Sequence, residues 1–409
     1  MRFHYECNDC HKEYYTDEVM YLCPSCAKEN TDPAQMRKGN LVVVLNEEDL
    51  RALKEKEDLA FYDFFPYEVP DHDAFPVGPT PVASPIRLQS KYGMKNVVCK
   101  CDSALPSGSF KDRASQLIIG QAKSHNEEKI VLASTGNAGA AMSCAGAAYG
   151  IDIVLFVPQT APVNKLMQSV LYGAQVVPVK GTYDDAFALS IAYTDNFGGI
   201  NRNTAYNPMT VEGKKSVSIE LFCQLGRTLP DIVYVSTGDG CIYGGVVKGF
   251  IDLYRAGLTD RIPKVVCVQS EKSNAIAHAW ETGEYTAVKA TTVADSISVS
   301  SPANGRMAVR YINESDGWAT VVTDEQILES QMELAKEAGL FVEPAAACAW
   351  AGFVKDHGRL KERFNDDVNV CVLLTGTGFK DMGVFKDRIT MPSSIENSVD
   401  AVIERFSQH

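Results

Sequence analysis

The stretch Pro106-Ser-Gly-Ser-Phe-Lys111-Asp-Arg113 places a single lysine between a turn and a helix. A short strand is predicted before it, at 96–102, and a helical run begins at Ala114. A lysine at such a junction can leave water without crossing the core. A desolvated lysine loses its proton readily and forms a Schiff base with an aldehyde. The segment therefore predicts a reactive amine at Lys111, against the alternative of a surface lysine after a loop.

Outward from this stretch, runs rich in Val, Ile and Leu alternate with helical patterns from Asn96 onward. The strand candidates lack an apolar–polar alternation, as expected of parallel strands that are covered on both faces. They lie at 130–134, 153–158, 175–179, 232–236, 265–269 and 368–374. The pattern predicts an α/β chain with doubly wound sheets, in which ligands bind where loops leave the carboxyl ends of strands.

Three loops that follow strand candidates carry unusual chemistry, and the first is Ser134-Thr135-Gly136-Asn137. It opens a helix expected at 140–149. Backbone N–H groups and two hydroxyls at a helix N-terminus form an anion site that suits a substrate carboxylate. The side chain of Asn137 can donate to a phenolic oxygen. A plain helix cap explains Ser134 or Thr135 but gives no reason for the whole tetrapeptide.

The second loop, Ser236-Thr-Gly238-Asp239-Gly240-Cys241-Ile242, follows a buried strand and precedes a helix. Closely spaced glycines let the backbone wrap a phosphate, and the helix dipole adds to the attraction. A dinucleotide fingerprint is the competing interpretation. It is disfavoured because three residues separate Gly240 from Gly244, which misplaces the third glycine. The loop therefore predicts a phosphate site at residues 238–242.

The third loop, Thr375-Gly376-Thr377-Gly378, directly follows the last strand candidate. A hydroxyl at a strand end can meet a ring nitrogen at close range. Together with Lys111 and the other loops, it completes a set of groups for an aldehyde, a phenolic oxygen, a phosphate, a ring nitrogen and a carboxylate. That set matches pyridoxal phosphate joined to an amino-acid substrate.

Four of the twelve cysteines form two Cys-x-x-Cys knuckles, Cys7 with Cys10 and Cys23 with Cys26. Four thiolates at this spacing can close a tetrahedral zinc site, which supplies folding energy to a short module. A ribbon that has lost its metal is the alternative, and a redox pair is disfavoured because two matched knuckles are present. Since the ribbon lies far from the catalytic loops in sequence, we expect its removal to affect solubility or assembly more than chemistry.

The bulk composition excludes several classes of partner. A net charge of −13 and a pI near 5.1 argue against nucleic acid and against an anionic membrane surface. The longest apolar stretch, 138–157, is interrupted by Gly150 and Asp152 and predicts a buried helix and strand rather than a membrane span. The first residues lack the apolar core of an export signal, so we expect a cytoplasmic protein with reduced thiols.

From about Gly78 to Asp381 the chain resembles the fold-type II pyridoxal-phosphate enzymes and, within them, the threonine synthases. The lysine motif at 106–113 and the loop at 134–137 are similar to the family's patterns. Further similar segments are 207–215, 238–243, 248–250 and 343–347. The resemblance implies two doubly wound open sheets of the tryptophan synthase β type, preceded by a zinc-ribbon-like module at 1–30. We expect a large cofactor domain from 31–112 and 206–409, and a small substrate domain from 113–205.

The resemblance also implies roles for the site residues. Lys111 would be the Schiff-base lysine and proton shuttle, Asn137 would bond the cofactor's 3-hydroxyl, and Thr375 would meet its ring nitrogen. The residues expected to hold its phosphate are Gly238, Asp239, Gly240, Cys241 and Ile242. Asp239 departs from the family pattern, and because a carboxylate cannot donate to phosphate, its charge must point away.

A second departure concerns the substrate. Thr210 stands where threonine synthases usually have an arginine that suits a phosphorylated substrate. Arg113 could take its place, but we expect Arg202 and Asn203 to bind the leaving phosphate through charge-assisted hydrogen bonds. The substrate carboxylate is expected on the loop of Ser134, Thr135 and Asn137.

The activity implied by the resemblance is that of a homo-oligomeric lyase that converts O-phospho-L-homoserine and water to L-threonine and phosphate. Its cofactors would be pyridoxal phosphate and a structural zinc. One alternative is another reaction on this scaffold, either a cysteate synthase-like β-replacement on O-phosphoserine or a serine/threonine ammonia-lyase. A catalytically silent binding protein is the other alternative, and the intact lysine and loops count against it.

Overall fold

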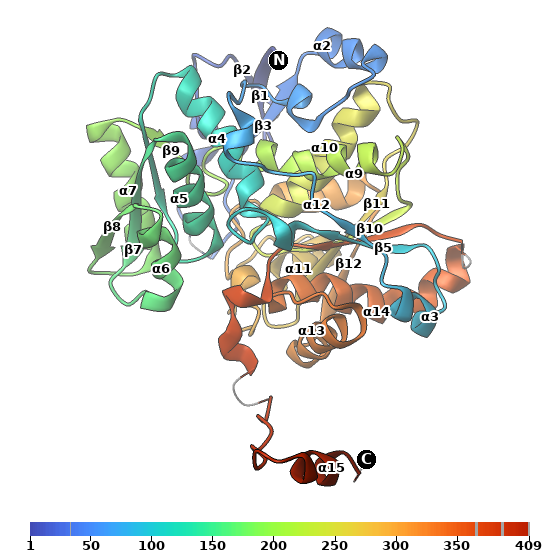
Figure 1. Ribbon diagram of the computed structural model, residues 1–409. Coiled ribbons are helices and arrows are strands. Elements are labelled where there is room, and N and C mark those ends of the chain that lie inside the picture. Colours follow the sequence, from blue (N-terminus) through green and yellow to red (C-terminus); the bar gives the residue numbers. More distant parts are fainter. Residues whose placement is uncertain (33, 365–366, 386–387, 408–409) are drawn as a thin grey trace.

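The chain folds into two α/β lobes, each built around an open sheet, with a small sheet at the N-terminus (Figure 1). The computed structural model describes residues 1–407 apart from 33, 365–366 and 386–387. Helices cover both faces of the larger sheet: α9, α10 and α12 lie on one side, and α13 and α14 on the other. This is the predicted α/β architecture.

The larger sheet has six strands in the order β12-β11-β10-β13-β5-β4. All neighbours are parallel except β4 and β5. The strands are β4 (Val82–Ala83), β5 (Val97–Cys101), β10 (Ile232–Ser236), β11 (Lys264–Ser270), β12 (Trp318–Val322) and β13 (Val370–Leu374). Because β10, β13 and β5 are adjacent and parallel, the loops that follow them leave the same edge of the sheet.

The near-continuous apolar composition of these strands follows from burial on both faces. Ile232 and Tyr234 of β10 join the core beneath α14, whereas Val233 and Val235 join the core beneath α10. Successive side chains of a strand point to opposite faces, so a strand between two helical layers needs apolar residues at every position.

The smaller sheet has four parallel strands in the order β8-β7-β6-β9. They are β6 (Lys129–Ala133), β7 (Asp152–Pro158), β8 (Gln175–Val179) and β9 (Ile200–Asn201). The loop after β6 leads directly into a helix that begins at Asn137.

The N-terminal sheet is antiparallel, in the order β2-β1-β3. Its strands are β1 (Phe3–Cys7), β2 (Glu13–Tyr14) and β3 (Leu41–Leu45). β3 pairs with all of β1 although it lies beyond residue 30. The short ribbon therefore completes its sheet with a strand from the segment that follows it.

The α-helices lie between these strands along the chain, and the last of them follows β13. They are α1 (Pro24–Ala27), α2 (Glu47–Ala52), α3 (Ile86–Tyr92), α4 (Lys111–Ser124), α5 (Asn137–Tyr149), α6 (Val163–Leu171), α7 (Tyr183–Phe197), α8 (Met209–Glu212), α9 (Ser216–Gln224), α10 (Cys241–Arg255), α11 (Ala275–Thr282), α12 (Gly305–Glu314), α13 (Asp324–Ala338), α14 (Pro344–Phe364) and α15 (Val399–Ser407). Within the described residues, none is long and apolar enough to cross a membrane.

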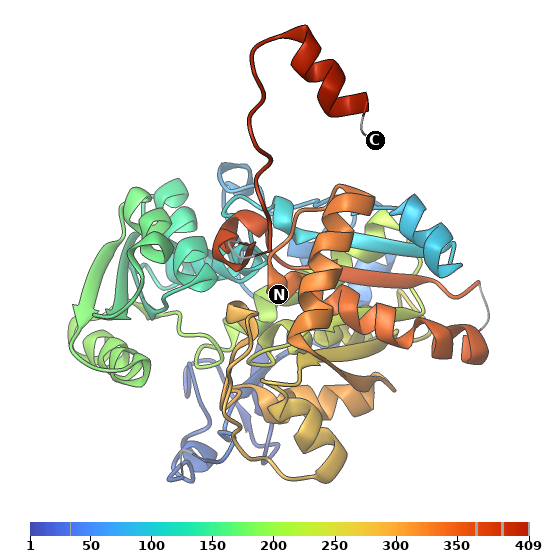
Figure 2. The same ribbon diagram turned by 90° about the horizontal axis from the view of Figure 1, so that it is seen from below.

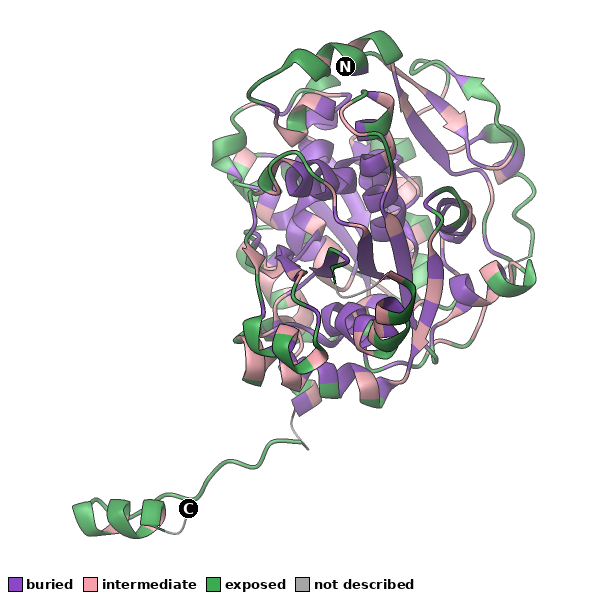
Figure 3. Ribbon diagram, turned by 90° about the vertical axis from the view of Figure 1, so that its right-hand side faces the viewer, coloured by how far each residue is buried: buried purple, intermediate pink, exposed green. Residues whose placement is uncertain are grey.

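The C-terminal helix stands apart from both lobes. Figure 2 shows α15 at the end of an extended arm, and Figure 3 shows that the arm is exposed while the strands of the large lobe are buried. Val399, Val402, Ile403 and Phe406 recur at helical spacing, and all four are exposed.

Candidate active site

Backbone hydrogen bonds join the loop of Lys111 to the loop that follows β13. The N–H of Phe110 donates to the carbonyl of Thr375 at 2.8 Å, and the N–H of Thr377 donates to the carbonyl of Gly108 at 3.0 Å. Since β5 and β13 are neighbouring strands, their two loops run side by side. The sheet therefore brings Lys111 and Thr375 together, although 264 residues separate them in sequence.

Lys111 is the first residue of α4 and is half-buried. Its ammonium makes no hydrogen bond or ion pair within the described part of the chain. The next residue, Asp112, is fully buried, and its Oδ2 accepts from the N–H of Ser107 at 2.7 Å. Burial raises the pKa of Asp112 to about 7. Asp112 thus fixes the turn that presents a free amine at Lys111.

Asn137 connects the two lobes. Its Nδ2 lies 3.2 and 3.1 Å from the two carboxylate oxygens of Glu343 and 3.2 Å from the hydroxyl of Ser296. Burial raises the pKa of Glu343, while the charge of Lys111 and the bonds from Asn137 and Ser296 partly offset that rise. Glu343 and Ser296 therefore belong to the site. The sequence drew attention to Glu343 only as part of a motif, and no sequence signal pointed to Ser296.

The hydroxyl of Ser134 caps α5 rather than facing the open site. It accepts from the N–H groups of Gly139 at 3.0 Å and Gly136 at 3.3 Å. Thr135 is half-buried beside it. The loop therefore offers a helix N-terminus in which Ser134 holds the turn and the other residues remain for an anion.

The loop after β10 forms a close-fitting glycine cradle at the N-terminus of α10. Gly240 has φ +88°, and a Cβ there would lie 2.7 Å from the carbonyl oxygen of Asn304. A Cβ on Gly238 would lie 2.8 Å from the Cα of Ile297. The carboxylate of Asp239 accepts from the N–H of Cys241 at 2.8 Å. Asp239 thus occupies one of the N–H groups at the start of α10.

Two buried cations lie against this cradle. Arg202 and Lys214 are both essentially inaccessible to solvent. Electrostatic interactions link Arg202 with Asp239 and Cys241, and link Lys214 with the same two residues and with Lys111. The residues that follow β9 therefore approach the phosphate loop.

The other residues considered for phosphate binding are engaged elsewhere. Asn203 accepts from the N–H of Ala133 at 2.7 Å and donates to Ser190 Oγ at 2.7 Å. Arg113 is buried and paired with Asp102 and Glu220. The hydroxyl of Thr210, where an arginine was expected, donates to the carbonyl of Asn207 at 2.7 Å. We therefore assign Asn203 to support of the loop after β6.

A cavity of about 310 Å³ opens between the lobes beside these groups. Asn137, Ser296 and Glu343 line it together with residues of α6. Lys380 donates to Gln168 of α6, and Gln168 donates to the carbonyl of Ser107 at 3.0 Å. The cavity is large enough for a small amino acid and is bridged by polar contacts from both lobes.

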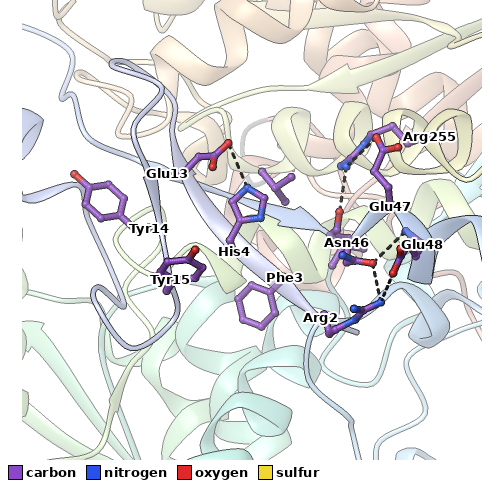
Figure 4. Close-up of a pocket in the computed structure, with 12 residues that line it drawn as sticks. Arg2, Phe3, His4, Glu13, Tyr14, Tyr15, Asn46, Glu47, Glu48 and Arg255 are labelled. Carbon is purple, nitrogen blue, oxygen red and sulfur yellow. Dashed lines mark hydrogen bonds and ion pairs between the residues drawn. The ribbon is translucent and has the colours of Figure 1, made fainter.

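A second pocket lies away from these loops, on the N-terminal sheet (Figure 4). Its volume is about 720 Å³, and the side chains that line it include Arg2, His4 and Glu48. Arg2 pairs with Glu48 at 3.1 Å, and His4 lies 3.8 Å from Glu13. Arg2 and Glu48 thus engage each other, and the lining of this pocket includes none of the site residues described above.

The four ribbon cysteines converge on one point. The Sγ atoms of Cys7, Cys10, Cys23 and Cys26 all lie within 4.8 Å of one another. The hydroxyl of Tyr14 lies 3.1 Å from Cys23 Sγ. Four sulfurs at this separation, with a hydrogen-bonding hydroxyl beside them, form a candidate metal site.

The ribbon also touches the segment that carries Arg202, although the two are far apart in sequence. The hydroxyl of Tyr21 accepts from the N–H of Asn201 at 3.0 Å, and its ring stacks on Tyr206 at 4.6 Å between centroids. Asn40, in the segment after the ribbon, donates to the carbonyl of Ala205 at 2.9 Å. The ribbon is therefore close to the site in space although it is far from it in sequence.

The sequence is similar to a known protein family and to individual members of it. A model of the family described as "Pyridoxal-phosphate dependent enzyme" matches residues 74–376. The chain is 31% identical to a threonine synthase of Methanosarcina acetivorans, with 98% of each chain covered. It is 30% identical to a threonine synthase of Methanocaldococcus jannaschii, with 92% of each covered.

Solved structures share the fold at lower identity. Maize serine racemase superposes with a TM-score of 0.66 at 21% identity, covering 75% of this chain and 90% of its own. The processed form of threonine deaminase isoform 2 from Solanum lycopersicum superposes with a TM-score of 0.64 at 18% identity, covering 76% and 83%. These two likenesses establish the α/β fold.

Proposed function

The chain belongs to the pyridoxal-phosphate-dependent enzymes and, within them, to the threonine synthases, and from this premise we propose that it converts O-phospho-L-homoserine and water to L-threonine and phosphate. One observation carries the proposal. The unpaired amine of Lys111, the N-terminus of α10 and Thr375 lie at one edge of the large sheet, and Asn137 at the start of α5 reaches that edge through Glu343. The reaction would serve threonine biosynthesis.

The residues present fit pyridoxal phosphate. Lys111 offers an amine without a partner in the described chain, the loop at 238–242 is a cradle that a Cβ would fill, and buried cations adjoin it. Lys111 would hold the aldehyde carbon, Asn137 the 3-hydroxyl and Thr375 the ring nitrogen. The residues that would hold the phosphate are Gly238, Asp239, Gly240, Cys241 and Ile242. When bound, pyridoxal phosphate supplies an electron-withdrawing ring that makes the carbon next to the substrate amine acidic.

Each remaining task falls to a group of the chain. Lys111 Nζ moves the proton from the substrate Cα and serves the later transfer at Cβ. The N-terminus of α5, with Thr135 and Asn137, orients the substrate carboxylate. Glu343 holds the Asn137 side chain in place through the contacts at 3.1 and 3.2 Å. Loss of a proton from Cβ lets phosphate leave Cγ, Cγ then takes up a proton to become the methyl group, water adds its hydroxyl at Cβ, and a proton returns to Cα.

The test is a product balance. Purified full-length protein with its cofactor is incubated with O-phospho-L-homoserine, O-phosphoserine or L-threonine, and phosphate, threonine and keto acid are measured. We expect phosphate and threonine in equal amounts from O-phospho-L-homoserine alone. Keto acid from threonine, without turnover of the phosphorylated substrate, would show an ammonia-lyase instead.

We also propose that Cys7, Cys10, Cys23 and Cys26 hold one zinc ion. The Cys7–Cys26 and Cys10–Cys23 sulfur pairs are each 3.8 Å apart. A tetrahedral site with zinc–sulfur bonds of about 2.3 Å requires sulfur–sulfur distances of about 3.8 Å. The arrangement of the thiols therefore supports a structural zinc, and metal analysis of protein prepared under nitrogen tests it.

The remaining proposals concern organisation. The four-stranded sheet, from residue 129 to residue 201, supports a small substrate domain at 113–205 within a larger cofactor domain of 31–112 and 206–409, after the ribbon of 1–30. The exposed apolar side chains of α15 support a homo-oligomer. Twelve cysteines without a disulfide support a cytoplasmic location.

A further inference from the structure

Arg202 and Lys214 differ from the other buried cations of this protein. Lys100 and Arg113 pair with Glu220, and Lys215 and Lys248 pair with Asp252. By contrast, Arg202 Nε and Nη2 are buried without a hydrogen-bond partner among the described residues. Its remaining nitrogen, Nη1, donates to the hydroxyl of Thr204 at 2.6 Å.

Lys214 likewise lacks a partner in the described part of the chain. It is fully buried, and in the described ranges no hydrogen bond or ion pair reaches its ammonium. Burial lowers the pKa of Lys214 to about 8 and that of Arg202 to about 10. An isolated buried charge is costly unless a counter-charge compensates it. The folded chain therefore favours an anion beside these two groups.

The backbone around the pair is built for a close approach to α10. A Cβ on Gly245 of α10 would lie 2.5 Å from the Cβ of Lys214. The acid nearest the N-terminus of α10 in sequence, Asp239, already accepts from Cys241 N–H at 2.8 Å. The two cations, the glycine cradle and the positive end of α10 thus converge from different elements, and among the described residues no carboxylate forms a direct ion pair with either cation, although Asp239 interacts with both electrostatically.

We propose that Arg202 and Lys214 form a clamp that binds a phosphoryl dianion at the N-terminus of α10. The inference rests on the proposed function and deepens it, because the reaction involves two phosphoryl groups. One belongs to the cofactor and the other to the substrate. Arg202 contributes two nitrogens, Nε and Nη2, whose N–H groups have no partner among the described residues, and Lys214 contributes charge on the side toward Lys111.

The alternative is that the pair supports the fold. The two cases differ in the sign of a stability change. If the charges await an anion, Lys214→Gln removes an unsatisfied charge, so the stripped full-length protein should melt at an equal or higher temperature. If Lys214 holds the fold together, the same substitution should lower the melting temperature whether or not phosphate is present.

The experiment compares parent, Lys214→Gln, Arg202→Gln and the exposed control Lys123→Gln as full-length protein stripped of cofactor. Inorganic phosphate should raise the melting temperature of the parent and of the control. Each clamp variant should bind inorganic phosphate about tenfold more weakly or worse, as loss of one charge-assisted hydrogen bond implies. Phosphate binding unchanged in both clamp variants would overturn the proposal.

Two further arms identify the source of the phosphoryl group. If the clamp holds the cofactor's phosphate, the variants should lose affinity for pyridoxal phosphate but not for pyridoxal, which lacks the phosphate. If it holds the substrate's phosphate, cofactor affinity should be unchanged, and inorganic phosphate should bind the loaded variants about tenfold more weakly. None of these readouts needs turnover. Intact phosphate binding without activity on O-phospho-L-homoserine would therefore refute the proposed function and leave the clamp standing.

Discussion

At the scale of single residues, the site is defined by which charges are paired and which are left free. Lys111 has no partner in the described chain, whereas its neighbour Asp112 is buried and bonded to Ser107 N–H at 2.7 Å. Glu343 is buried against Asn137 and Ser296. A free amine beside held carboxylates can move protons without first breaking an ion pair.

The first prediction concerns Lys111. Lys111→Ala should lower kcat by about 10²–10⁴-fold or more, because it removes the group assigned to proton transfer at Cα and Cβ. Steady-state rates with O-phospho-L-homoserine measure the loss, and borohydride reduction of the parent should fix the cofactor to Lys111 in a peptide map. Lys123→Ala, which removes an exposed lysine from the same helix, is the control. Label on another lysine would contradict the assignment.

The second prediction follows from the pKa of Asp112. Burial raises it from 3.8 to about 7, so the folded state binds this proton more tightly than the unfolded state. Its stabilising contribution is therefore complete below about pH 4 and is lost as the pH rises through about 7. The free energy of unfolding of Asp112→Asn, relative to that of the parent, should increase by about 2–4 kcal/mol when the pH is raised from 4 to 8.

Denaturant unfolding at several pH values measures this difference. Asp152→Asn, which removes an exposed acid from the start of β7, is the matched control. If the parent and Asp112→Asn curves stay parallel across this range, Asp112 is ionised in the folded protein and another group compensates its charge.

At the scale of elements, the adjacent parallel strands β10, β13 and β5 position the loops that follow them. The Val, Ile and Leu runs were sufficient to predict β10 and β13, because strands buried on both faces need apolar residues throughout. β9 has two residues, too few to form a pattern. α5 begins at Asn137 instead of 140. Gly136 and Asn137 are weak helix formers, but Ser134 Oγ accepts from the N–H groups of Gly136 and Gly139 and so supports an earlier first turn.

The contacts within the site were harder to predict than the elements. Asn137 and Glu343 are 206 positions apart, and only the packing of the two lobes brings them together. Arg202 and Lys214 are fully buried, whereas composition alone suggests that arginine and lysine lie at the surface. Sequence therefore predicted that these loops follow strands of the sheets, the chemistry assigned to them stays a prediction, and the structure was needed to show which charges lack partners.

The third prediction tests the cradle at the N-terminus of α10. Gly240→Ala should cost more than Gly150→Ala, although both glycines have positive φ: Gly240 precedes the first residue of α10, and Gly150 ends α5. A Cβ at Gly240 would lie 2.7 Å from a backbone oxygen, while at Gly150 nothing lies within 4 Å. We expect a loss of about 1 kcal/mol at Gly150 from backbone strain and about 2–3 kcal/mol at Gly240.

Only Gly240→Ala should also weaken binding of pyridoxal phosphate, because only that glycine adjoins the phosphate loop. Denaturant unfolding and cofactor titration measure the two effects separately. Equal losses in stability and in cofactor affinity for the two variants would show that the space around Gly240 is not limiting.

At the scale of the whole molecule, the ribbon lies in contact with the segment that follows β9. The hydroxyl of Tyr21 accepts from Asn201 N–H at 3.0 Å, and its ring stacks on Tyr206. Arg202 lies between Asn201 and Tyr206 in the sequence. Our sequence-based expectation was that removing the ribbon would affect solubility or assembly more than chemistry. The contacts give a different expectation, because a loosened ribbon would also release the segment that carries Arg202.

The fourth prediction is that metal loss from the ribbon reaches the site. Cys7→Ser with Cys10→Ser should abolish the bound zinc, expected at about one per chain, because two ligands cannot hold a structural site. It should also lower the melting temperature and weaken phosphate binding to the stripped protein, since Asn201 and Tyr206 would lose their anchor. Cys223→Ser, which removes a thiol from α9 outside the ribbon, is the control. Metal content, melting curves and phosphate titrations measure the three effects on the same samples. Loss of zinc with unchanged phosphate affinity would show that the contact at Tyr21 is structural only and that the segment bearing Arg202 is held by its own lobe.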